Sequence, residues 1–258
     1  MGLRTCRKNH PHWPELRPYR YAHRGYHSTE FPENTLPAFE RAVENGFGAE
    51  LDVHLTKDGK LVVFHDDDLK RVCDVDHRTA ALNAADFAKY PINGTTYTAP
   101  MLEDVLRIFE GKTPLIVEIK VDHANYAAVT EATCAVLDQF HVTYCIESFD
   151  PRVLVWLKKN RPEICRGQLS QNFVKRPDGG NLSKLTRWVL TNLYANFLTH
   201  PDFIAYRFED RNCRAMKVCR NRYGVQEVNW TIRRREDLLE AEANGCIPIF
   251  EHFHPDIP

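Results

Sequence analysis

The chain has 258 residues, a formal net charge of −1 and nearly equal numbers of acidic and basic side chains. Because the charges are interspersed rather than gathered in basic runs, we expect no nucleic-acid partner and no polybasic membrane patch. No stretch approaches the roughly 20 apolar residues that cross a bilayer, which argues against a transmembrane segment. The length favours a single domain over residues 1–258, acting on a small molecule.

The N-terminal residues and the cysteines bear on where the protein works. Residues 1–19 are basic and contain proline and aromatic side chains, but they lack the apolar centre of a secretory signal. We interpret them as an arm that leads into the first strand. The eight cysteines are scattered without a close CxxC pair, which is typical of reduced thiols. Together these features predict a cytoplasmic location.

Short apolar runs alternate with amphipathic stretches along the chain, as in β/α units around a parallel sheet. The expected strands are 19–23, 47–55, 61–64, 114–120, 142–147, 164–169, 203–207, 225–231 and 247–251. The expected helices are 36–45, 101–109, 125–140, 151–160 and 182–197. The strand at 61–64 belongs to a hairpin, and the other strands suffice for an α/β barrel of eight parallel strands.

The chain between the second and third barrel strands departs from this alternation. A turn at residues 57–60 forms the hairpin and brings His65 back to the end of the second strand. Residues 69–100 are polar and irregular, with a turn signal at Asn93-Gly94. We expect them to form a small insertion rather than a separately stable domain.

The late helix at 182–197 follows a loop predicted at residues 177–180. Apolar residues at helical spacing predict a stripe that faces the core. The stripe consists of Leu182, Leu185, Val189, Leu193 and Phe197. For Trp188, Tyr194 and Phe197 we favour packing over a lipid-facing surface.

Carboxylates gather where the first barrel strands are expected to end, and such ends converge on one mouth. Glu50 and Asp52 are two residues apart, so their side chains point to the same face of a strand, and the same holds for Glu118 and Lys120. Carboxylates aimed into one interior repel each other and need a cation. Oxygen donors suit Mg²⁺ or Ca²⁺ better than zinc. The alternative is an internal ion network with Arg24 and Lys120 and no metal.

Two histidines lie at neighbouring strand ends. His23 ends the first strand, and His65 ends the hairpin strand. Either one alone could be a capping or a satisfied buried histidine. Their convergence beside carboxylates indicates acid and base chemistry instead.

Six short motifs resemble, in their order, the signature of the glycerophosphodiester phosphodiesterase family. They are His23-Arg24-Gly25, Pro32-Glu33-Asn34-Thr35, Glu50-Leu51-Asp52-Val53, Thr56-Lys57-Asp58-Gly59, His65-Asp66 and Glu118-Ile119-Lys120. The resemblance continues through three further segments, so it covers nearly the whole chain from Tyr21 onwards. These segments are Ser148-Phe149-Asp150, Asn229-Trp230-Thr231 and Ile249-Phe250-Glu251.

The resemblance implies a TIM barrel with a small insertion after the hairpin, matching residues 69–100. It implies hydrolysis of glycerophosphodiesters to sn-glycerol 3-phosphate and an alcohol with one divalent metal ion, Mg²⁺ or Ca²⁺, with Mn²⁺ as a further candidate. By resemblance, the metal ligands are Glu50, Asp52 and Glu118. The implied general base and general acid are His23 and His65, and the implied phosphate-binding residues are Arg24 and Lys120.

The chemistry explains why these residue types occur together. A phosphodiester anion repels nucleophiles, so cations must neutralise the charge on its oxygens. One histidine removes a proton from the attacking group and the other protonates the leaving alkoxide. The residues do not decide which histidine has which role, and His23 is assigned as the base by the resemblance alone.

Several neighbouring residues have two interpretations. Phe149 and Trp230 are candidates for the wall of a glycerol pocket, although aromatic residues at strand ends also serve as core. Asn34 could touch the metal, but we favour a helix cap. The run from Gly245 ends in Glu251 and His252 where many relatives carry Asp, which leaves substrate selectivity open.

Two other functions compete with the first. Phospholipase D-like hydrolysis of lysophospholipids or sphingolipids needs an apolar groove, and no clear lipid-binding stripe is visible in the sequence. A catalytically silent barrel could serve as a binding module, but such a module has no need for both histidines beside the carboxylates. No motif defines the alcohol group or the oligomeric state.

Overall fold

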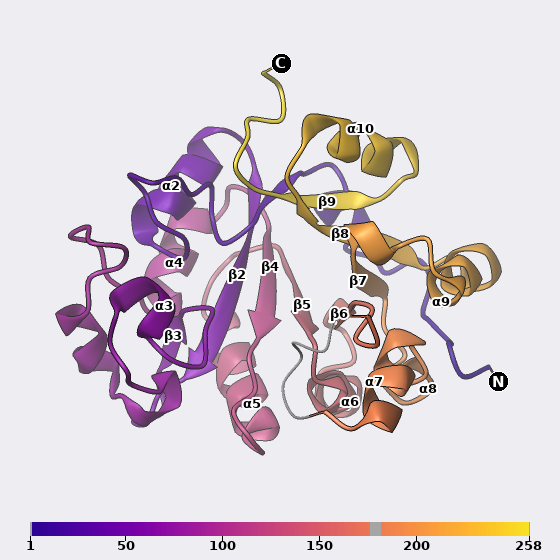
Figure 1. Cartoon of the computed structure of the whole chain (residues 1–258), viewed down its shortest axis with the longest axis horizontal. Helices are drawn as coiled ribbons and strands as arrows, with labels where there is room; N and C mark the ends of the chain where they lie inside the picture. The colour runs from indigo at the N-terminus through magenta and orange to yellow at the C-terminus, as the bar shows by residue number, and fades with distance from the viewer. Residues whose placement is uncertain (1, 176–181, 258) are drawn as a thin grey trace.

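The computed structural model describes residues 2–175 and 182–257. Nine strands form one sheet in the order β1-β9-β8-β7-β6-β5-β4-β2-β3, and an additional pairing of β1 with β2 closes it. Strand β3 pairs antiparallel with β2 outside the closed ring, while the ring strands are parallel neighbours. Helices surround the ring (Figure 1). The fold is a TIM barrel, which confirms the expected fold class.

The elements lie close to the positions expected from the sequence. The strands are β1 (Tyr21–Ala22), β2 (Gly48–Leu55), β3 (Leu61–Val63), β4 (Leu115–Ile119), β5 (Tyr144–Ser148), β6 (Arg166–Ser170), β7 (Phe203–Arg207), β8 (Gln226–Ile232) and β9 (Ile247–Phe250). The α-helices are α1 (Trp13–Leu16), α2 (Leu36–Glu44), α3 (Lys70–Cys73), α4 (Leu102–Phe109), α5 (Tyr126–Leu137), α6 (Pro151–Asn160), α7 (Lys184–Thr191), α8 (Asn196–Thr199), α9 (Arg214–Val218) and α10 (Arg235–Ala243). Short turns of other helix types are η1 (Thr79–Ala81), η2 (Ala84–Lys89), η3 (Phe208–Asp210) and η4 (Cys219–Tyr223).

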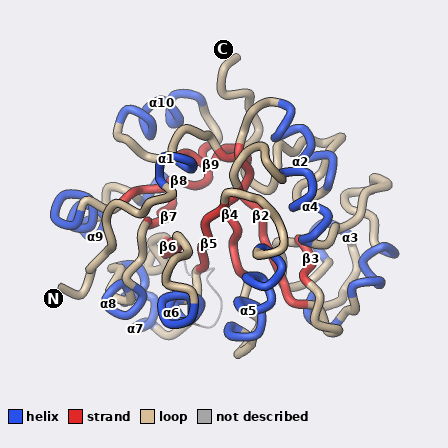
Figure 2. The backbone as a smooth tube through the Cα atoms, turned by 180° about the vertical axis from the view of Figure 1, so that it is seen from behind, coloured by secondary structure: helices blue, strands red, loops and turns tan. Residues whose placement is uncertain are grey.

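The core has two layers because successive strand residues point to opposite faces. Leu115 and Val117 of β4 pack outward against the helices, whereas Ile116 joins an inner cluster with Phe203. The N-terminal arm completes this inner cluster. Trp13 of α1 meets the Phe203 ring edge-on, with ring centroids 5.9 Å apart. Figure 2 shows α1 lying across the strands from behind. The arm therefore covers the N-terminal end of the barrel before it leads into β1.

The insertion between β3 and α4 contains α3, η1 and η2. Its apolar residues form a small cluster together with Val62 of β3 and with Phe64. This cluster consists of Val62, Phe64, Leu69, Val72, Phe87, Ile92 and Ala99. The turn expected at Asn93-Gly94 is present, with positive φ at both residues. The insertion therefore packs on the hairpin, at the edge of the mouth.

The prediction of one long helix at 182–197 is wrong, because the structure has two short helices there, α7 and α8. The break lies at Leu193, which is buried and has φ of +57°. The left-handed backbone conformation at this residue separates α7 from α8. The loop expected at residues 177–180 lies outside the described residues.

The core-facing stripe expected on this segment is wrong at Leu185 and Phe197 but confirmed at Leu193, which is buried. Leu185 is 68% exposed and Phe197 is 42% exposed. Trp188, which was expected to pack inward, is 49% exposed. Tyr194 is partly buried, and the Arg4 guanidinium lies 4.4 Å from its ring centroid. Leu185 and Trp188 precede the break and Phe197 follows it, so apolar side chains remain at the surface on both sides of Leu193.

Two further features concern the whole described chain. In residues 2–175 and 182–257, no helix combines the length and apolar character needed to span a bilayer. All eight cysteines are free.

Candidate active site

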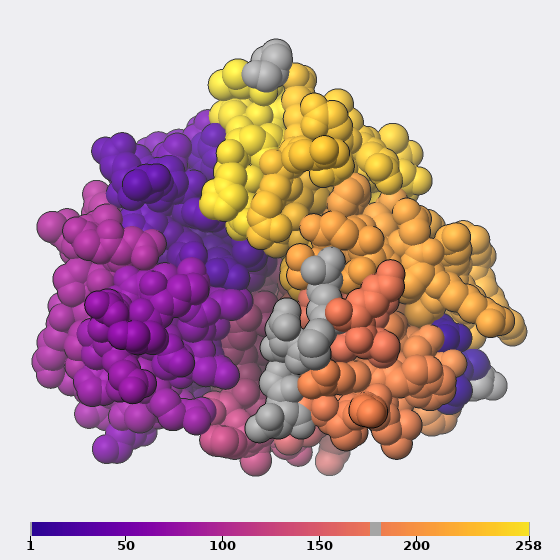
Figure 3. All heavy atoms as spheres, viewed as in Figure 1, coloured from indigo at the N-terminus to yellow at the C-terminus, as the bar shows by residue number. Residues whose placement is uncertain are grey.

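A cavity of about 150 Å³ lies at the C-terminal mouth of the barrel. Its polar lining consists of His23, Arg24, Glu50, His65, Glu118, Glu147, Thr231 and Arg233. Its apolar lining consists of Phe149, Leu169, Trp230 and Ile249. In the space-filling view an early segment of the chain, in the lighter indigo shades, meets the yellow C-terminal segment near the middle of this face (Figure 3). Most of the residues singled out in the sequence are therefore brought to one cavity.

The three predicted metal ligands form a compact buried cluster. Glu50 and Asp52 lie on β2, and Asp52 is in register with Glu118 on the adjacent β4. Each residue offers an oxygen within 4.8 Å of the oxygens of the other two. Burial, followed by repulsion from Asp52 and Glu118, raises the pKa of Glu50 well above its ordinary value. The cluster thus holds three acids away from water, where the neutral form of Glu50 is favoured.

Lys120 and Arg24 offset negative charge in this cluster. Lys120 Nζ lies 2.9 Å from Asp52 Oδ1 and 2.7 Å from Glu118 Oε1. Arg24 Nε lies 3.6 Å from Asp52 Oδ2. Although burial acts to raise the pKa of Asp52, Lys120 and then other positive neighbours hold it well below the ordinary value. The ion network considered as an alternative to metal binding is therefore present in the structure.

The loop after β1 is held in an unusual backbone conformation. Arg24 and Asn34 both have positive φ, which is uncommon outside glycine. The Arg24 backbone N–H donates to Glu50 Oε2 at 3.1 Å, and Asn34 Nδ2 donates to Asp52 Oδ2 at 2.9 Å. Gly25 has φ of +80°, and a Cβ there would meet the Ala38 backbone at 2.9 Å. Contacts with the carboxylate cluster thus stabilise this loop.

The expected cap role of Asn34 is wrong. The N-cap of α2 is Thr35, and neither residue makes a side-chain capping bond to this helix. The Asn34 side chain instead turns inward to Asp52. A buried carboxylate without a hydrogen-bond donor costs more free energy than an unpaired backbone group at a helix end. The Asn34 amide therefore bonds Asp52 rather than capping α2.

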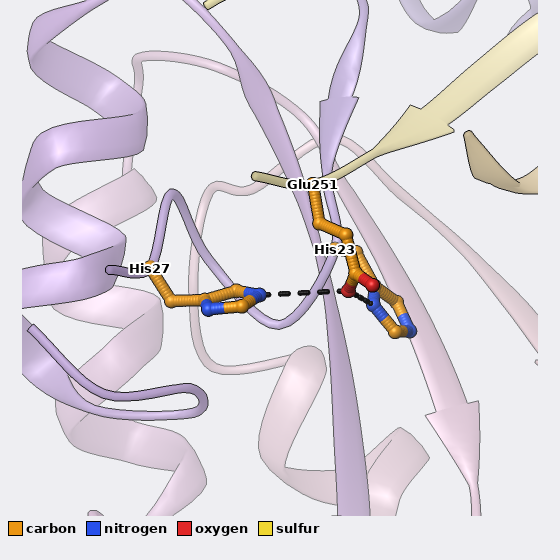
Figure 4. A group of neighbouring side chains, drawn as sticks. All are labelled: His23, His27 and Glu251. Carbon is orange, nitrogen blue, oxygen red and sulfur yellow. Dashed lines mark hydrogen bonds and ion pairs between the residues drawn. The ribbon is translucent and has the colours of Figure 1, made fainter. Parts of the chain in front are cut away.

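Glu251 connects two histidines at the rim of the cavity. His23 Nδ1 bonds one oxygen of the Glu251 carboxylate, and His27 Nε2 lies 3.5 Å from the same oxygen. The carboxylate lies between the two imidazole rings (Figure 4). Its other oxygen accepts from Arg233 at 2.7 Å. The bond at Nδ1 leaves His23 Nε2 on the side of Glu50, 3.9 Å from Glu50 Oε2.

The surroundings shift the pKa values of both His23 and Glu251. Burial lowers the pKa of His23 to about 4, although its bond to Glu251 acts in the opposite direction. Burial acts to raise the pKa of Glu251, but bonds from His23 and His27 hold it well below the ordinary value. The arrangement therefore favours a neutral imidazole beside an ionised carboxylate.

His65 has a carboxylate partner of its own. His65 Nδ1 lies 2.5 Å from Asp66 Oδ1, and Arg71 Nε donates to Asp66 Oδ2 at 2.6 Å. Arg71 also reaches Glu33, which pairs with Arg24. His23 and His65 therefore enter the cavity from different elements, each with its Nδ1 held by a carboxylate.

Glu147 of β5 is a site residue that sequence reasoning missed. It is 1% exposed, and its Oε2 has no hydrogen-bond partner among the described residues. It is in register with Glu118 on the neighbouring strand and lines the same cavity. Burial, followed by repulsion from Glu118, raises its pKa well above the ordinary value. The one available signal was its place directly before the Ser148-Phe149-Asp150 motif.

Two aromatic residues form one wall of the cavity. The ring centroids of Phe149 and Trp230 lie 5.6 Å apart in an edge-on arrangement. Trp230 Nε1 donates to the Ala205 carbonyl at 3.1 Å, which fixes the orientation of the indole. Both rings line the cavity and also pack against the inner apolar cluster, so the two interpretations given from the sequence apply together to their positions.

A model described as the glycerophosphoryl diester phosphodiesterase family matches residues 23–254. The chain belongs to this family. It is a phosphodiesterase, a hydrolase of phosphoric diesters. The match spans every cavity residue described above.

Relatives and solved structures agree with this placement. The uncharacterized protein YqiK of Bacillus subtilis is 31% identical over 248 residues, covering 89% of this chain and 94% of that protein. A glycerophosphodiester phosphodiesterase of Caldanaerobacter subterraneus is 29% identical over 239 residues, covering 88% of this chain and 91% of that protein. The solved phosphodiesterase of Oleispira antarctica, in complex with sn-glycerol-3-phosphate, has a TM-score of 0.73 and 23% identity over 91% of this chain and 92% of that one. This structural likeness supports the barrel fold.

Proposed function

We propose that the chain hydrolyses glycerophosphodiesters to sn-glycerol 3-phosphate and an alcohol with the help of one divalent cation. The observation that supports this proposal most is the arrangement of His23 and His65, each oriented by a carboxylate, beside three clustered acids. The names of two relatives point in the same direction. One is a glycerophosphodiester phosphodiesterase, and the other was solved with sn-glycerol-3-phosphate.

The residues around the cavity fit a divalent cation. Glu50, Asp52 and Glu118 would hold it, because they present oxygen donors within 4.8 Å of one another. Among the described residues, Glu147 lines the same cavity as Glu50 and Glu118, and Arg24 is shared with Glu33. Burial and repulsion from neighbouring acids raise the pKa of Glu50 and Glu147 despite Arg24 and Lys120, so a divalent cation would be needed to hold all these acids ionised. When bound, Mg²⁺ or Ca²⁺, or Mn²⁺ in their place, would withdraw charge from the phosphodiester oxygens.

The chain's own cations and aromatic rings would bind the substrate. We propose that Arg24 and Lys120 contact the remaining phosphate oxygens, since both lie beside the carboxylate cluster. Phe149 and Trp230 would contact the carbon atoms of the glycerol, because they form the apolar wall of the same cavity.

The histidines would transfer the protons. With Nδ1 held by Glu251, His23 has Nε2 free to accept a proton from the attacking oxygen. His65 is held in the same way by Asp66 and would give a proton to the leaving alkoxide. Overall one water is consumed, the bond from phosphorus to the alcohol oxygen breaks, and that oxygen keeps the electron pair and gains the proton. The base role of His23 follows the family resemblance.

We propose in addition that residues 1–258 act as one domain, with the insertion at about 69–100 as part of the mouth. The apolar cluster that the insertion shares with Val62 of β3 and with Phe64 supports this view. The cytoplasmic location stays a prediction from the sequence.

Phosphorus NMR of purified protein with a panel of glycerophosphodiesters tests the function. The panel contains glycerophosphocholine, glycerophosphoethanolamine and glycerophosphoinositol, each with Mg²⁺, Ca²⁺ or Mn²⁺ and with a chelator. We expect a new phosphomonoester signal that matches sn-glycerol 3-phosphate and disappears with the chelator. Silence with every substrate and metal would contradict the proposal and favour a binding module.

A further inference from the structure

Two groups of side chains in the described part of the chain bring three potential metal ligands together. One is the carboxylate cluster. The other, here called the histidine cluster, consists of His23, His27 and Glu251, whose ligand atoms all lie within 4.8 Å of one another. Its donors are two imidazole nitrogens and one carboxylate oxygen. This donor set suits Zn²⁺, whereas the all-oxygen cluster suits Mg²⁺ and Ca²⁺.

The spacing in the histidine cluster is close to that of a tetrahedral zinc site. Ligand atoms about 2.1 Å from a tetrahedral Zn²⁺ lie roughly 3.4 Å from one another. His27 Nε2 is 3.5 Å from Glu251 Oε2, and His23 Nδ1 bonds the same oxygen. Both rings point toward the carboxylate (Figure 4). A cation can enter once the hydrogen bond at His23 lengthens to this spacing.

The imidazole of His27 lacks a good hydrogen bond at Nε2. This atom is buried, and its approach to Glu251 Oε2 at 3.5 Å lies at the edge of hydrogen-bond range. A buried polar atom without a partner costs free energy, and a bound cation would remove that cost. The proposed hydrolysis assigns no role to His27.

Neighbouring side chains hold Glu251 in a position that suits a cation. Arg233 Nε donates to Glu251 Oε1 at 2.7 Å, and His252 Nε2 lies 3.3 Å from the same oxygen. These contacts occupy Oε1 and leave Oε2 facing the two imidazole rings. The Arg233 side chain is half exposed, so water and salt screen its charge. Outer contacts of this kind orient the ligands in metal sites.

A separate cavity gives a cation access to the cluster. It has a volume of about 620 Å³, and His27, His252 and His254 are among the residues that line it. His27 connects the two spaces, because it lines this cavity and also reaches Glu251 at the rim of the catalytic one. A cation can therefore approach the histidine cluster from this side without passing through the catalytic cavity.

A cation in this position would change which nitrogen of His23 carries the proton. A neutral imidazole has one N–H, so while Nδ1–H donates to Glu251, Nε2 has the lone pair that accepts a proton. A cation on Nδ1 takes the lone pair of that nitrogen, and the proton moves to Nε2. The ring gains and loses no proton overall, but its Nε2 can no longer act as a base.

We propose that the histidine cluster is a second cation site, selective for Zn²⁺ over Mg²⁺ and Ca²⁺, whose occupancy inhibits turnover by holding His23 in the tautomer with Nε2 protonated. The binding site depends only on the geometry of the cluster. Its inhibitory effect rests on the proposed function, in which His23 is the base. The carboxylate cluster keeps its own cation.

Calorimetric zinc binding tests the site. Zn²⁺ is titrated into the wild type, His27→Ala and His27→Gln, each in excess Mg²⁺ so that the carboxylate cluster is filled. We expect both variants to bind Zn²⁺ at least about tenfold more weakly than the wild type. His27→Gln keeps a polar side chain and serves if His27→Ala folds poorly. His123→Ala, at an exposed position, is the matched control and should bind as the wild type does.

Turnover and NMR measure the effect on His23. Inhibition of glycerophosphocholine hydrolysis by Zn²⁺ is measured for each protein relative to its own turnover with Mg²⁺ alone. The inhibitory concentration should rise at least about tenfold in both His27 variants and stay unchanged in His123→Ala. Nitrogen NMR of labelled histidines, assigned with His23→Ala, should show the His23 proton moving from Nδ1 to Nε2 as Zn²⁺ binds.

Any of three results would overturn the proposal. The first is equal zinc binding by the wild type and both His27 variants. The second is inhibition that excess Mg²⁺ relieves equally in all proteins, which would place Zn²⁺ on the carboxylate cluster. The third is bound Zn²⁺ that leaves turnover or the His23 tautomer unchanged.

Silence of the wild type with every substrate would instead mean that the proposed function has failed. Zinc binding and the His23 NMR signal then decide the site separately. Zinc binding that depends on His27 and moves the His23 proton supports the site, and zinc binding that does neither contradicts it.

Discussion

The two ends of the barrel interior are built by the same strands but contain opposite kinds of side chain. On β4, Ile116 joins the apolar cluster at the N-terminal end, and Glu118 joins the carboxylate cluster at the mouth. On β5, Cys145 and Glu147 repeat this pair. A step of two residues keeps a side chain on the inner face and moves it from the first layer to the second.

The N-terminal end of the barrel stabilises the fold, and the mouth contains the proposed catalytic groups. Burial of apolar side chains, including Trp13, stabilises the N-terminal end of the barrel. The mouth contains buried acids and non-glycine residues with positive φ, both of which are destabilising on their own. The free energy that apolar burial contributes at the N-terminal end offsets the destabilising features at the mouth. The predictions below test whether changes at one end leave the other unaffected.

The largest expected effect is on turnover from a change at the mouth. Replacement His23→Ala removes the proposed proton acceptor, so kcat should fall by about 10² to 10⁴. The free energy of unfolding in urea should stay near that of the wild type. His12→Ala, at an exposed position in the arm, is the matched control and should keep full activity. Near-normal kcat in His23→Ala would remove this histidine from the mechanism.

The opposite experiment changes the apolar end. Trp13→Ala deletes a buried side chain that packs on Phe203, and the free energy of unfolding should fall by about 3–5 kcal/mol. Urea unfolding measures this loss, while kcat/KM of the folded protein should change less than twofold. Trp188→Ala, at a position 49% exposed, serves as the control and should have a much smaller effect. A large loss of kcat in Trp13→Ala would mean that the two ends are not separable.

A milder change at the mouth tests whether the orientation of His23 matters, and not only its presence. Glu251→Gln leaves His23 in place but replaces the carboxylate that holds its Nδ1. We expect kcat to fall by up to about a hundredfold while KM stays within about twofold, because the base is misaligned and substrate contacts remain. Steady-state kinetics separates the two constants. An unchanged kcat would show that Glu251 does not position His23.

The smallest expected effect concerns packing inside the barrel. A Cβ at Gly167 would meet the Phe203 ring at 2.1 Å, so Gly167→Ala should destabilise the fold by about 1–3 kcal/mol. The second substitution Phe203→Leu should relieve part of this overpacking, which a double-mutant cycle of unfolding free energies detects. Additive effects would contradict the packing that the structure shows.

Much of the fold could be predicted because the alternation of strands and helices is strong. Glu50 with Asp52, and Glu118 with Lys120, could be placed on one face by their spacing alone. The late helix could not be predicted, because apolar periodicity does not reveal the left-handed backbone at Leu193 that interrupts it. The exposed apolar surface of α7 and α8 was misjudged because periodicity alone does not distinguish a stripe that faces the core from one at the surface.

The missed site residues share a physical cause. Glu147 is a lone acid in a strand, and only its register with Glu118 places it in the cavity. The bond between Glu251 and His23 joins the two ends of the chain, which local patterns cannot show. Asn34 has a sequence context that suits a cap, but closure of the barrel brings the Asp52 carboxylate within its reach. The contacts that form only when the barrel closes could therefore not be predicted from the sequence.

The most direct test of the central claim is a metal titration at the mouth. Wild type and Glu50→Gln are treated with chelator and titrated with Mg²⁺, Ca²⁺ or Mn²⁺, while binding and sn-glycerol 3-phosphate release are measured on the same samples. We predict one site in the wild type, turnover that follows its occupancy, and much weaker binding in Glu50→Gln. Turnover that survives complete metal removal, or equal metal binding by both proteins, would contradict the proposed role of the carboxylate cluster.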